Sequence, residues 1–307
     1  MNKATRDGFG EQLVLSSKNN PNIIVLSADL GKATKVYDFS KLYKDRFFEC
    51  GIAENNMIGI ASGLSEYGYK VFLSSFCSFL TGKYDTIRCS IAYPNRPCIL
   101  VGTHSGLSIG RDGVTQMGLE DISLMRSLPN MTVLNPSTYI ECRKMVEYLC
   151  ETELNGPHYL RLGRQPVNEV FDENYKFELG ENIIVKEGKN GVIFSTGCIL
   201  PDVIEATKDI DINIINVHTV KPMSYNSIKN YLVYDNIFTI EDHSIIGGLG
   251  SSIAEIMSEN SICSKLTRIG LNDVFPESGK PSDLYDKYGL SSIKINQKIK
   301  EVLNAHR

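Results

Sequence analysis

The chain has 307 residues, 42% of them hydrophobic, with a formal net charge of −4 at pH 7, which predicts two α/β domains that each bury a core. The acidic balance and the lack of a Lys/Arg run argue against a nucleic-acid partner. The first residues carry no apolar leader and no stretch is apolar for long enough to span a bilayer, so we expect a cytoplasmic protein without a membrane partner.

Short β-branched, apolar runs alternate with helix-like segments in the first half of the chain. These runs lie at 22–26, 71–73, 98–102 and 131–134. Such alternation is typical of βα units around a largely parallel sheet. A second series of apolar runs lies at 192–195, 212–217 and 237–240. The sequence therefore predicts an α/β fold of two tandem doubly wound domains with largely parallel sheets.

A polar, turn-rich stretch separates the two series. It contains Asp172-Glu173-Asn174 and, further on, a run of charged residues and glycines over 186–191. Such clusters are typical of the punctuation between elements. We expect a first domain over 1–170, a linker over 171–190 and a second domain over 191–307.

The first candidate for chemistry in chain order is Glu54, a carboxylate at the start of a predicted helix. Small residues at 59, 61 and 63 would let another surface approach this helix closely. A buried carboxylate needs a hydrogen-bonding partner, and a ligand could be that partner. The alternative is that Glu54 only complements the dipole of its helix.

Two phenylalanines, Phe76 and Phe79, follow the apolar run 71–73. They could offer a flat face to a heteroaromatic ring, or they could belong to the core. Further along, Arg161 and Arg164 end a strand-like run. Their guanidinium groups could hold a phosphate, or a carboxylate of the fold.

A glycine-rich loop over 103–117 follows the apolar run 98–102. Loops after strand ends are where open α/β sheets bind ligands. The loop carries His104, Arg111, Asp112 and Gln116, which predict a polar site the size of a sugar. Its Gly-Arg-Asp-Gly piece lacks a leading Gly-Asp-Gly, so we predict no metal site there. The eight cysteines form no Cys-x-x-Cys or Cys/His cluster, and we expect reduced thiols.

Taken together, these residues resemble the transketolase family over nearly the whole chain. The resemblance covers the pyrimidine-binding domain, here 1–170, and the transketolase C-terminal domain, here 191–307. It rests on the segments 52–57, 75–81, 110–117, 241–243, 247–250 and 278–281.

The resemblance implies thiamine diphosphate as the cofactor. Glu54 would be the catalytic carboxyl group that hydrogen-bonds to the 1′ nitrogen of the aminopyrimidine, favouring the imino tautomer that deprotonates the thiazolium carbon. Phe76 and Phe79 would pack on the pyrimidine ring. Asp29 matches a family aspartate close to the cofactor.

For the substrate, the resemblance implies that His104 and Asp112 contact the hydroxyl groups of the sugars. Arg6, His104 and Arg164 would hold the terminal phosphate of a sugar phosphate. Two positions depart from the family pattern. Gln116, which we count among the substrate-binding residues, stands where many members have His, and Ala33 stands where many have a phosphate-binding Ser.

The family holds the diphosphate and its Mg²⁺ or Ca²⁺ through a Gly-Asp-Gly motif with a later Asn, and this sequence has no such motif. The resemblance therefore implies a split transketolase. It would transfer a two-carbon ketol unit from a ketose to an aldose only with a separate N-terminal, diphosphate-binding subunit that also holds the metal. The assembly expected is a heterotetramer built on a dimer of this chain.

Other functions remain open at this point. The β subunit of a 2-oxo-acid dehydrogenase decarboxylase shares the two-domain plan, but the polar loop 103–117 suits a sugar better than an apolar 2-oxo acid. Deoxyxylulose-phosphate synthase normally carries its diphosphate domain on the same chain. A non-catalytic homologue is a further alternative, against which the presence of Glu54 and the two phenylalanines argues.

Overall fold

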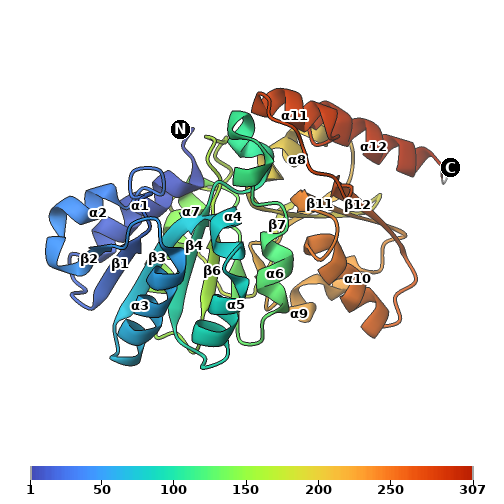
Figure 1. Ribbon diagram of the computed structural model, residues 1–307. Coiled ribbons are helices and arrows are strands. Elements are labelled where there is room, and N and C mark those ends of the chain that lie inside the picture. The colour runs from blue at the N-terminus through green and yellow to red at the C-terminus, as the bar shows by residue number, and fades with distance from the viewer. Residues whose placement is uncertain (1, 306–307) are drawn as a thin grey trace.

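The computed structural model, which describes residues 2–305, contains two β-sheets, each flanked by helices (Figure 1). The first sheet has seven strands in the order β10-β5-β6-β4-β3-β1-β2. Its strands are β1 (Ile23–Ser27), β2 (Phe47–Glu49), β3 (Lys70–Phe76), β4 (Cys98–Thr103), β5 (Thr132–Leu134), β6 (His158–Arg161) and β10 (Thr219–Lys221). All pair in parallel except β10, which runs antiparallel to β5.

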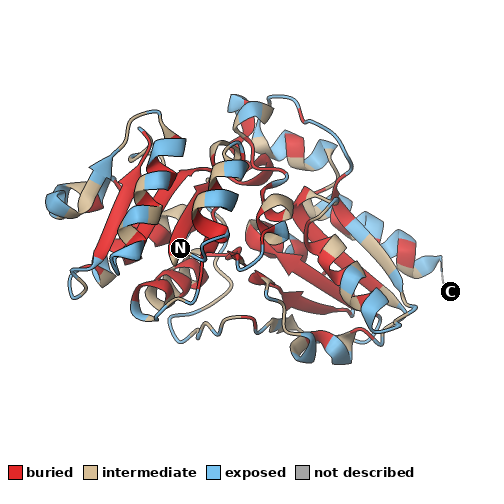
Figure 2. Ribbon diagram, turned by 60° about the horizontal axis from the view of Figure 1, so that its bottom comes forward, coloured by how far each residue is buried: buried red, intermediate tan, exposed pale blue. Residues whose placement is uncertain are grey.

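Helices cover both faces of this sheet, which explains why its central strands are apolar on both sides. Alternate residues serve opposite faces: Leu26 packs in one hydrophobic cluster with Met57, and Val25 packs in another with Phe9. The helices of this half are α1 (Thr5–Ser16), α2 (Tyr37–Leu42), α3 (Glu54–Glu66), α4 (Cys77–Thr81), α5 (Tyr84–Ile87), α6 (Asp121–Ser127) and α7 (Tyr139–Glu151). The burial of the strands between the helices is visible in Figure 2.

The second sheet has five strands in the order β12-β11-β8-β9-β7, with only β7 antiparallel. These strands are β7 (Ile183–Lys186), β8 (Val192–Thr196), β9 (Asn213–Asn216), β11 (Asn236–Ser244) and β12 (Lys265–Leu271). Its helices are α8 (Leu200–Ala206), α9 (Tyr225–Ile228), α10 (Leu249–Glu259), α11 (Pro281–Lys287) and α12 (Ser292–Asn304). Two α/β units with largely parallel sheets confirm the predicted fold class.

The structure differs from the expected linker over 171–190 in its last part. Strand β7 lies inside that range and pairs with β9 of the second sheet. Strand β10, from the second half of the chain, returns to the first sheet and pairs with β5. Both are edge strands of three or four residues, so neither produces the long apolar run by which the central strands were predicted. A division at 170 and 190 therefore leaves β7 outside the sheet to which it belongs, and it does not show that β10 returns to the first sheet.

Within residues 2–305, no helix is long and apolar enough to cross a bilayer. The eight cysteines are free thiols. Burial raises the pKa of Cys98 to about 11 and that of Cys150 to about 12. These two thiols therefore stay protonated and act as small apolar side chains of the core.

Candidate active site

The predicted site residues gather beyond the carboxyl ends of the parallel strands in the first sheet. These strands end at one edge, so the segments that follow them are neighbours there. The residues that end or follow them are Asp29 (β1), Glu54 (β2), Phe76 and Phe79 (β3), His104, Asp112 and Gln116 (β4) and Arg164 (β6). Arg6, in the first turn of α1, joins this set because Nη1 of its guanidinium lies 3.2 Å from Nε2 of His104.

Glu54 is the first residue of α3. Its exposed fraction is 8%, and its carboxylate makes no hydrogen bond or ion pair with any residue in the described range 2–305. Its position at the helix N-terminus places a carboxylate beside the free backbone N–H groups of the first turn, but a buried carboxylate usually has a direct donor. Both alternatives remain compatible with the structure: Glu54 lies at the helix N-terminus, and its carboxylate is free to bind a ligand.

The small residues of α3 do not all serve a close approach within this chain. Ala61 is buried in the core, as the pattern predicts. Nothing within the described part of this chain approaches Gly59 or Gly63, because a Cβ added to either would have no atom within 4 Å. They lie on the outer face of the helix, opposite the apolar side that packs on the sheet.

Three rings form a stack at the ends of β3 and β4. The centroids of Phe76 and Phe79 are 5.2 Å apart with an interplanar angle of 19°. The ring of His104 also stacks on Phe76, with 3.8 Å between the ring centroids. Phe76 is buried in a core cluster and Phe79 is half-buried against it. The pair is part of the core, and Phe79 keeps part of its surface exposed.

His104 is held in one tautomer. Its Nδ1 lies 2.8 Å from Oγ1 of Thr103, and that hydroxyl donates to the carbonyl of Ser75. Because a guanidinium can only donate, Nε2 accepts from Arg6 and Nδ1 carries the proton. Burial, and then the charges of Arg6 and Arg164, lower the pKa of His104 to about 3. The ring is therefore neutral at physiological pH.

The two predicted phosphate-binding arginines differ in their surroundings. Arg6 donates from Nη1 to the carbonyl of Ala33 at 3.0 Å, while its buried Nε has no partner among residues 2–305. Arg164 donates from Nη1 to the carbonyl of Ile109 at 2.9 Å and to Oδ2 of Asp112 at 3.1 Å. The side chains of this ion pair are 36% and 52% exposed, so the pair contributes only about 0–1 kcal/mol and a ligand can compete for it.

Arg161, the other arginine at the end of β6, is a structural residue. Its exposed fraction is 2%, and its Nε donates to Oδ2 of Asp121 at 2.8 Å. Its Nη2 donates to the carbonyls of Gly118 and Asp242. Of the two alternatives left open for this residue, the structure selects a carboxylate of the fold.

Asp29 and Gln116 take no part in the contacts described so far. Asp29 is exposed, at φ +57°, and its backbone N–H donates to Oε1 of Glu49 at 2.7 Å. Glu49 also accepts from the N–H of Gly51, so it ties the end of β1 to the turn before Glu54. Sequence analysis missed Glu49, although a carboxylate at a strand end so close to Glu54 was a signal. Gln116 is half-buried at the end of a 3-10 turn, η4 (Val114–Gln116).

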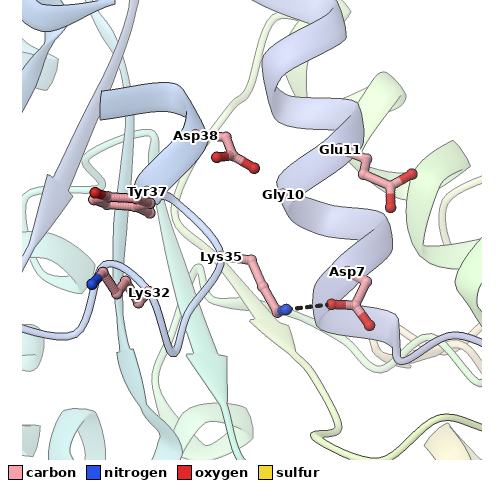
Figure 3. A pocket seen from close by; sticks show the side chains of 7 residues that line it. All are labelled: Asp7, Gly10, Glu11, Lys32, Lys35, Tyr37 and Asp38. Carbon is pink, nitrogen blue, oxygen red and sulfur yellow. Dashed lines mark ion pairs between the residues drawn. The ribbon is translucent and has the colours of Figure 1, made fainter. Parts of the chain in front are cut away.

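A separate hollow of about 250 Å³ lies between α1 and the segment before α2 (Figure 3). Figure 3 shows Lys35 reaching Asp7, with 2.8 Å between Nζ and Oδ1. None of the predicted site residues lines this hollow. Its walls carry three carboxylates and two lysines, in the set Asp7, Gly10, Glu11, Lys32, Lys35, Tyr37 and Asp38. With both signs of charge present, it shows no preference for an anion.

The donor set at the strand ends fits one part of thiamine diphosphate. A nearly buried carboxylate without a partner suits the ring nitrogen of an aminopyrimidine, and a flat phenyl surface suits its face. The diphosphate is a different matter. Residues 2–305 contain no cluster of three or more His, Cys, Asp or Glu side chains that could hold a metal ion.

Comparison with known proteins agrees with this geometry. Residues 1–169 match the family model for the transketolase pyrimidine binding domain, and residues 180–295 match that for the transketolase C-terminal domain. The chain is 38% identical over 307 residues to a transketolase C-terminal section of Methanocaldococcus jannaschii, covering 97% of this chain and 96% of that one. It is 34% identical over 304 residues to a 6-deoxy-6-sulfo-D-fructose transketolase subunit of Clostridium sp. (strain MSTE9), covering 97% and 94%. Among solved structures, a split gene transketolase, an inactive beta4 tetramer, matches with a TM-score of 0.90 and 38% identity over 99% of each chain.

Proposed function

Since this chain belongs to the transketolase family, as a section made of its pyrimidine-binding and C-terminal domains, we propose that it is one subunit of a split, thiamine-diphosphate-dependent transketolase. With a separate diphosphate-binding subunit it transfers a two-carbon ketol unit from a ketose to an aldose. The matches to transketolase domains do not favour a 2-oxo-acid dehydrogenase.

The observation that carries the proposal is Glu54, a residue only 8% exposed whose carboxylate has no partner among residues 2–305 and is still open to solvent. Glu54 holds or donates a proton at the ring nitrogen of the cofactor, and the stacked pair of Phe76 and Phe79 orients the ring. Asp29 completes the nearby wall. When bound, the cofactor supplies the electron sink that a carbon–carbon bond cleavage next to a carbonyl requires.

At the other end of the site, Arg6 and Arg164 receive the terminal anion of the substrate, and His104 positions Arg6 through Nε2. The buried Nε of Arg6 has an unused N–H, and the exposed pair of Arg164 with Asp112 can reopen. Nε2 of the neutral His104 is engaged by Arg6 and becomes an acceptor for a sugar hydroxyl group when Arg6 turns to the anion, and Asp112 and Gln116 add further polar contacts. A relative whose substrate name carries a 6-sulfo group supports a sugar with an anion at its far end. We propose a phosphorylated sugar as the substrate.

The diphosphate and its Mg²⁺ or Ca²⁺ are held by the partner subunit. The outer face of α3 supports an assembly in which another chain covers this site. Gly59 and Gly63 are open there, and the nearby side chains of Ile52 and Tyr67 are 84% and 85% exposed. The related inactive beta4 tetramer supports both self-association of this chain and its need for a second polypeptide. The active form is a heterotetramer of two copies of each subunit.

Reconstitution tests the proposal. The chain is mixed with its diphosphate-binding partner, thiamine diphosphate and Mg²⁺, and three substrate series are offered: ketose phosphates, the same ketoses without phosphate, and 2-oxo acids. Ketol transfer to an aldose is the expected result. Decarboxylation of 2-oxo acids alone would identify the dehydrogenase function instead, and a well-formed complex without turnover in any series would identify a non-catalytic homologue.

A further inference from the structure

The glycine-rich loop 104–117, which carries His104, Asp112 and Gln116, is built onto the second domain. Leu107, Ile109 and Met117 are fully or almost fully buried. They belong to the same hydrophobic cluster as residues of the second sheet and its helices, including Ile193 and Leu284. A 3-10 segment of the loop, η3 (Gly106–Asp112), packs against α11 and β11. The loop thus leaves β4 of the first domain and is anchored in the core of the second.

A polar contact fixes the beginning of this loop. Asp242, near the end of β11, is 5% exposed. Its Oδ1 accepts the backbone N–H of Leu107 at 3.0 Å, and its Oδ2 accepts the hydroxyl of Tyr285 at 2.5 Å. The approach is close: Gly106 has φ +65°, and a Cβ added there would lie 2.0 Å from Oδ2 of Asp242. Only glycine fits at position 106, because any side chain there would collide with the carboxylate of Asp242.

The far part of the loop meets a second segment of the same domain. Gly110 has φ +69°, and a Cβ added there would lie 2.8 Å from Cδ of Pro281. From the other side, Arg164 donates to the carbonyl of Ile109. The loop is therefore held along its length by Asp242, Tyr285 and Pro281, which the predicted site does not include, and by Arg164, which it does.

We propose that Asp242 and Tyr285 are a positioning pair that fixes the loop 104–117 and thereby sets the affinity of the site for its sugar substrate. This inference rests on the proposed function. A loop with several glycines has many conformations available, and holding it in one conformation before binding removes an entropic cost from binding. The second domain contributes no residue to the predicted site, and positioning this loop gives it a part in substrate recognition.

The test uses Tyr285→Phe and Asp242→Asn. Phenylalanine removes the hydroxyl that orients Asp242. The carboxamide of Asn has a single acceptor oxygen, so it cannot serve both donors. Tyr175→Phe is the matched control, since the hydroxyl of Tyr175 donates to the buried carboxylate of Glu141 at 2.8 Å and neither residue touches the loop.

Hydrogen exchange on the isolated chain measures directly how well the backbone amides of the loop are protected, and it requires no enzymatic activity. We expect the amides of residues 105–118 to exchange roughly tenfold faster in both variants, as loss of one hydrogen bond to a carboxylate implies, and to keep the wild-type rate in Tyr175→Phe. In the reconstituted enzyme, KM for sugars should rise several-fold while kcat changes little.

Unchanged exchange in the loop would overturn the inference, as would faster exchange with an unchanged KM. If Tyr285→Phe and Tyr175→Phe changed the exchange rates of the loop equally, Asp242 and Tyr285 would only contribute to the stability of the fold, and the inference would be wrong. If the reconstituted pair shows no ketol transfer, the proposed function fails, and the exchange rates alone then decide whether the pair fixes the loop.

Discussion

Nη1 of Arg6 lies 3.2 Å from Nε2 of His104, although 98 positions separate the two residues in the chain. The contact joins the first turn of α1 to the loop after β4. It also determines the chemistry of the imidazole, because a guanidinium beside Nε2 opposes a second positive charge there. His104 is thereby kept as a neutral acceptor.

This arrangement makes the stability of the chain depend on pH through His104. Burial and the two arginines hold its folded-state pKa at about 3, below the ordinary 6.5. Between these values the unfolded chain binds a proton that the folded chain does not. The contribution to stability is therefore complete above about pH 6.5 and is lost as pH falls toward 3. Between pH 7 and 5 the wild type should lose about 2 kcal/mol more unfolding free energy than His104→Gln. Urea unfolding at both pH values measures this, and equal losses would contradict it.

Arg164→Ala tests the anion site. Loss of a charge-assisted contact of about 1.5–3 kcal/mol should raise KM for phosphorylated sugars by roughly one to two orders of magnitude, with little effect on their non-phosphorylated counterparts. Arg143→Ala is the control. Like Arg164, Arg143 pairs with an exposed carboxylate, that of Glu173, but it lies away from the site. Steady-state kinetics on matched sugars give the comparison. An equal loss on both substrate series, with a lower melting temperature, would show that Arg164 only supports the loop through Ile109.

Arg161, three positions earlier, should behave in the opposite way. Arg161→Leu leaves Asp121 without its cation in a site where both side chains are at most 3% exposed. Breaking a buried pair from one side costs about 3–5 kcal/mol, so the variant should unfold at much lower urea concentration. Arg164→Ala should stay within about 1 kcal/mol of the wild type. Comparable stabilities of the two variants would overturn the division of roles between these arginines.

Glu54→Gln should leave the fold intact and lower turnover of the reconstituted enzyme by roughly two to four orders of magnitude, as loss of a group that manages a proton does. Glu66→Gln, at the other end of the same helix, is the control. Glu66 pairs with Arg96 on the surface and should be replaceable without effect. Turnover near the wild-type rate in Glu54→Gln would show that this carboxylate serves only the helix dipole.

The apolar runs predicted most of the central strands, because a strand buried on both faces is usually apolar. The exception is β6, which is buried although it begins with His158 and ends with Arg161, and which was seen only as a strand-like run. The edge strands β7 and β10 could not be predicted in this way, since their pairing depends on where the chain returns after the first domain. The site shows the same division. Phe76 and His104 follow predicted strands, so their common edge was foreseeable, whereas Glu54 follows β2, which was not predicted.

The roles of Arg161 and Arg164 could not be separated from the sequence. Both follow the same strand, and only tertiary structure shows that one turns toward Asp121 in the interior and the other toward Asp112 at the surface. The contact of Asp242 with the loop could not be predicted from the sequence for the same reason. It joins residues 135 positions apart, and no local pattern indicates such a pairing.

We propose that this chain supplies only part of a cofactor site. Titration calorimetry with thiamine diphosphate and Mg²⁺ tests it directly, first on the isolated chain and then on an equimolar mixture with the diphosphate-binding subunit. We expect no measurable binding to the isolated chain, because residues 2–305 hold no cluster of metal-binding side chains, and clear binding to the mixture. Micromolar binding of the cofactor by the isolated chain would contradict the account.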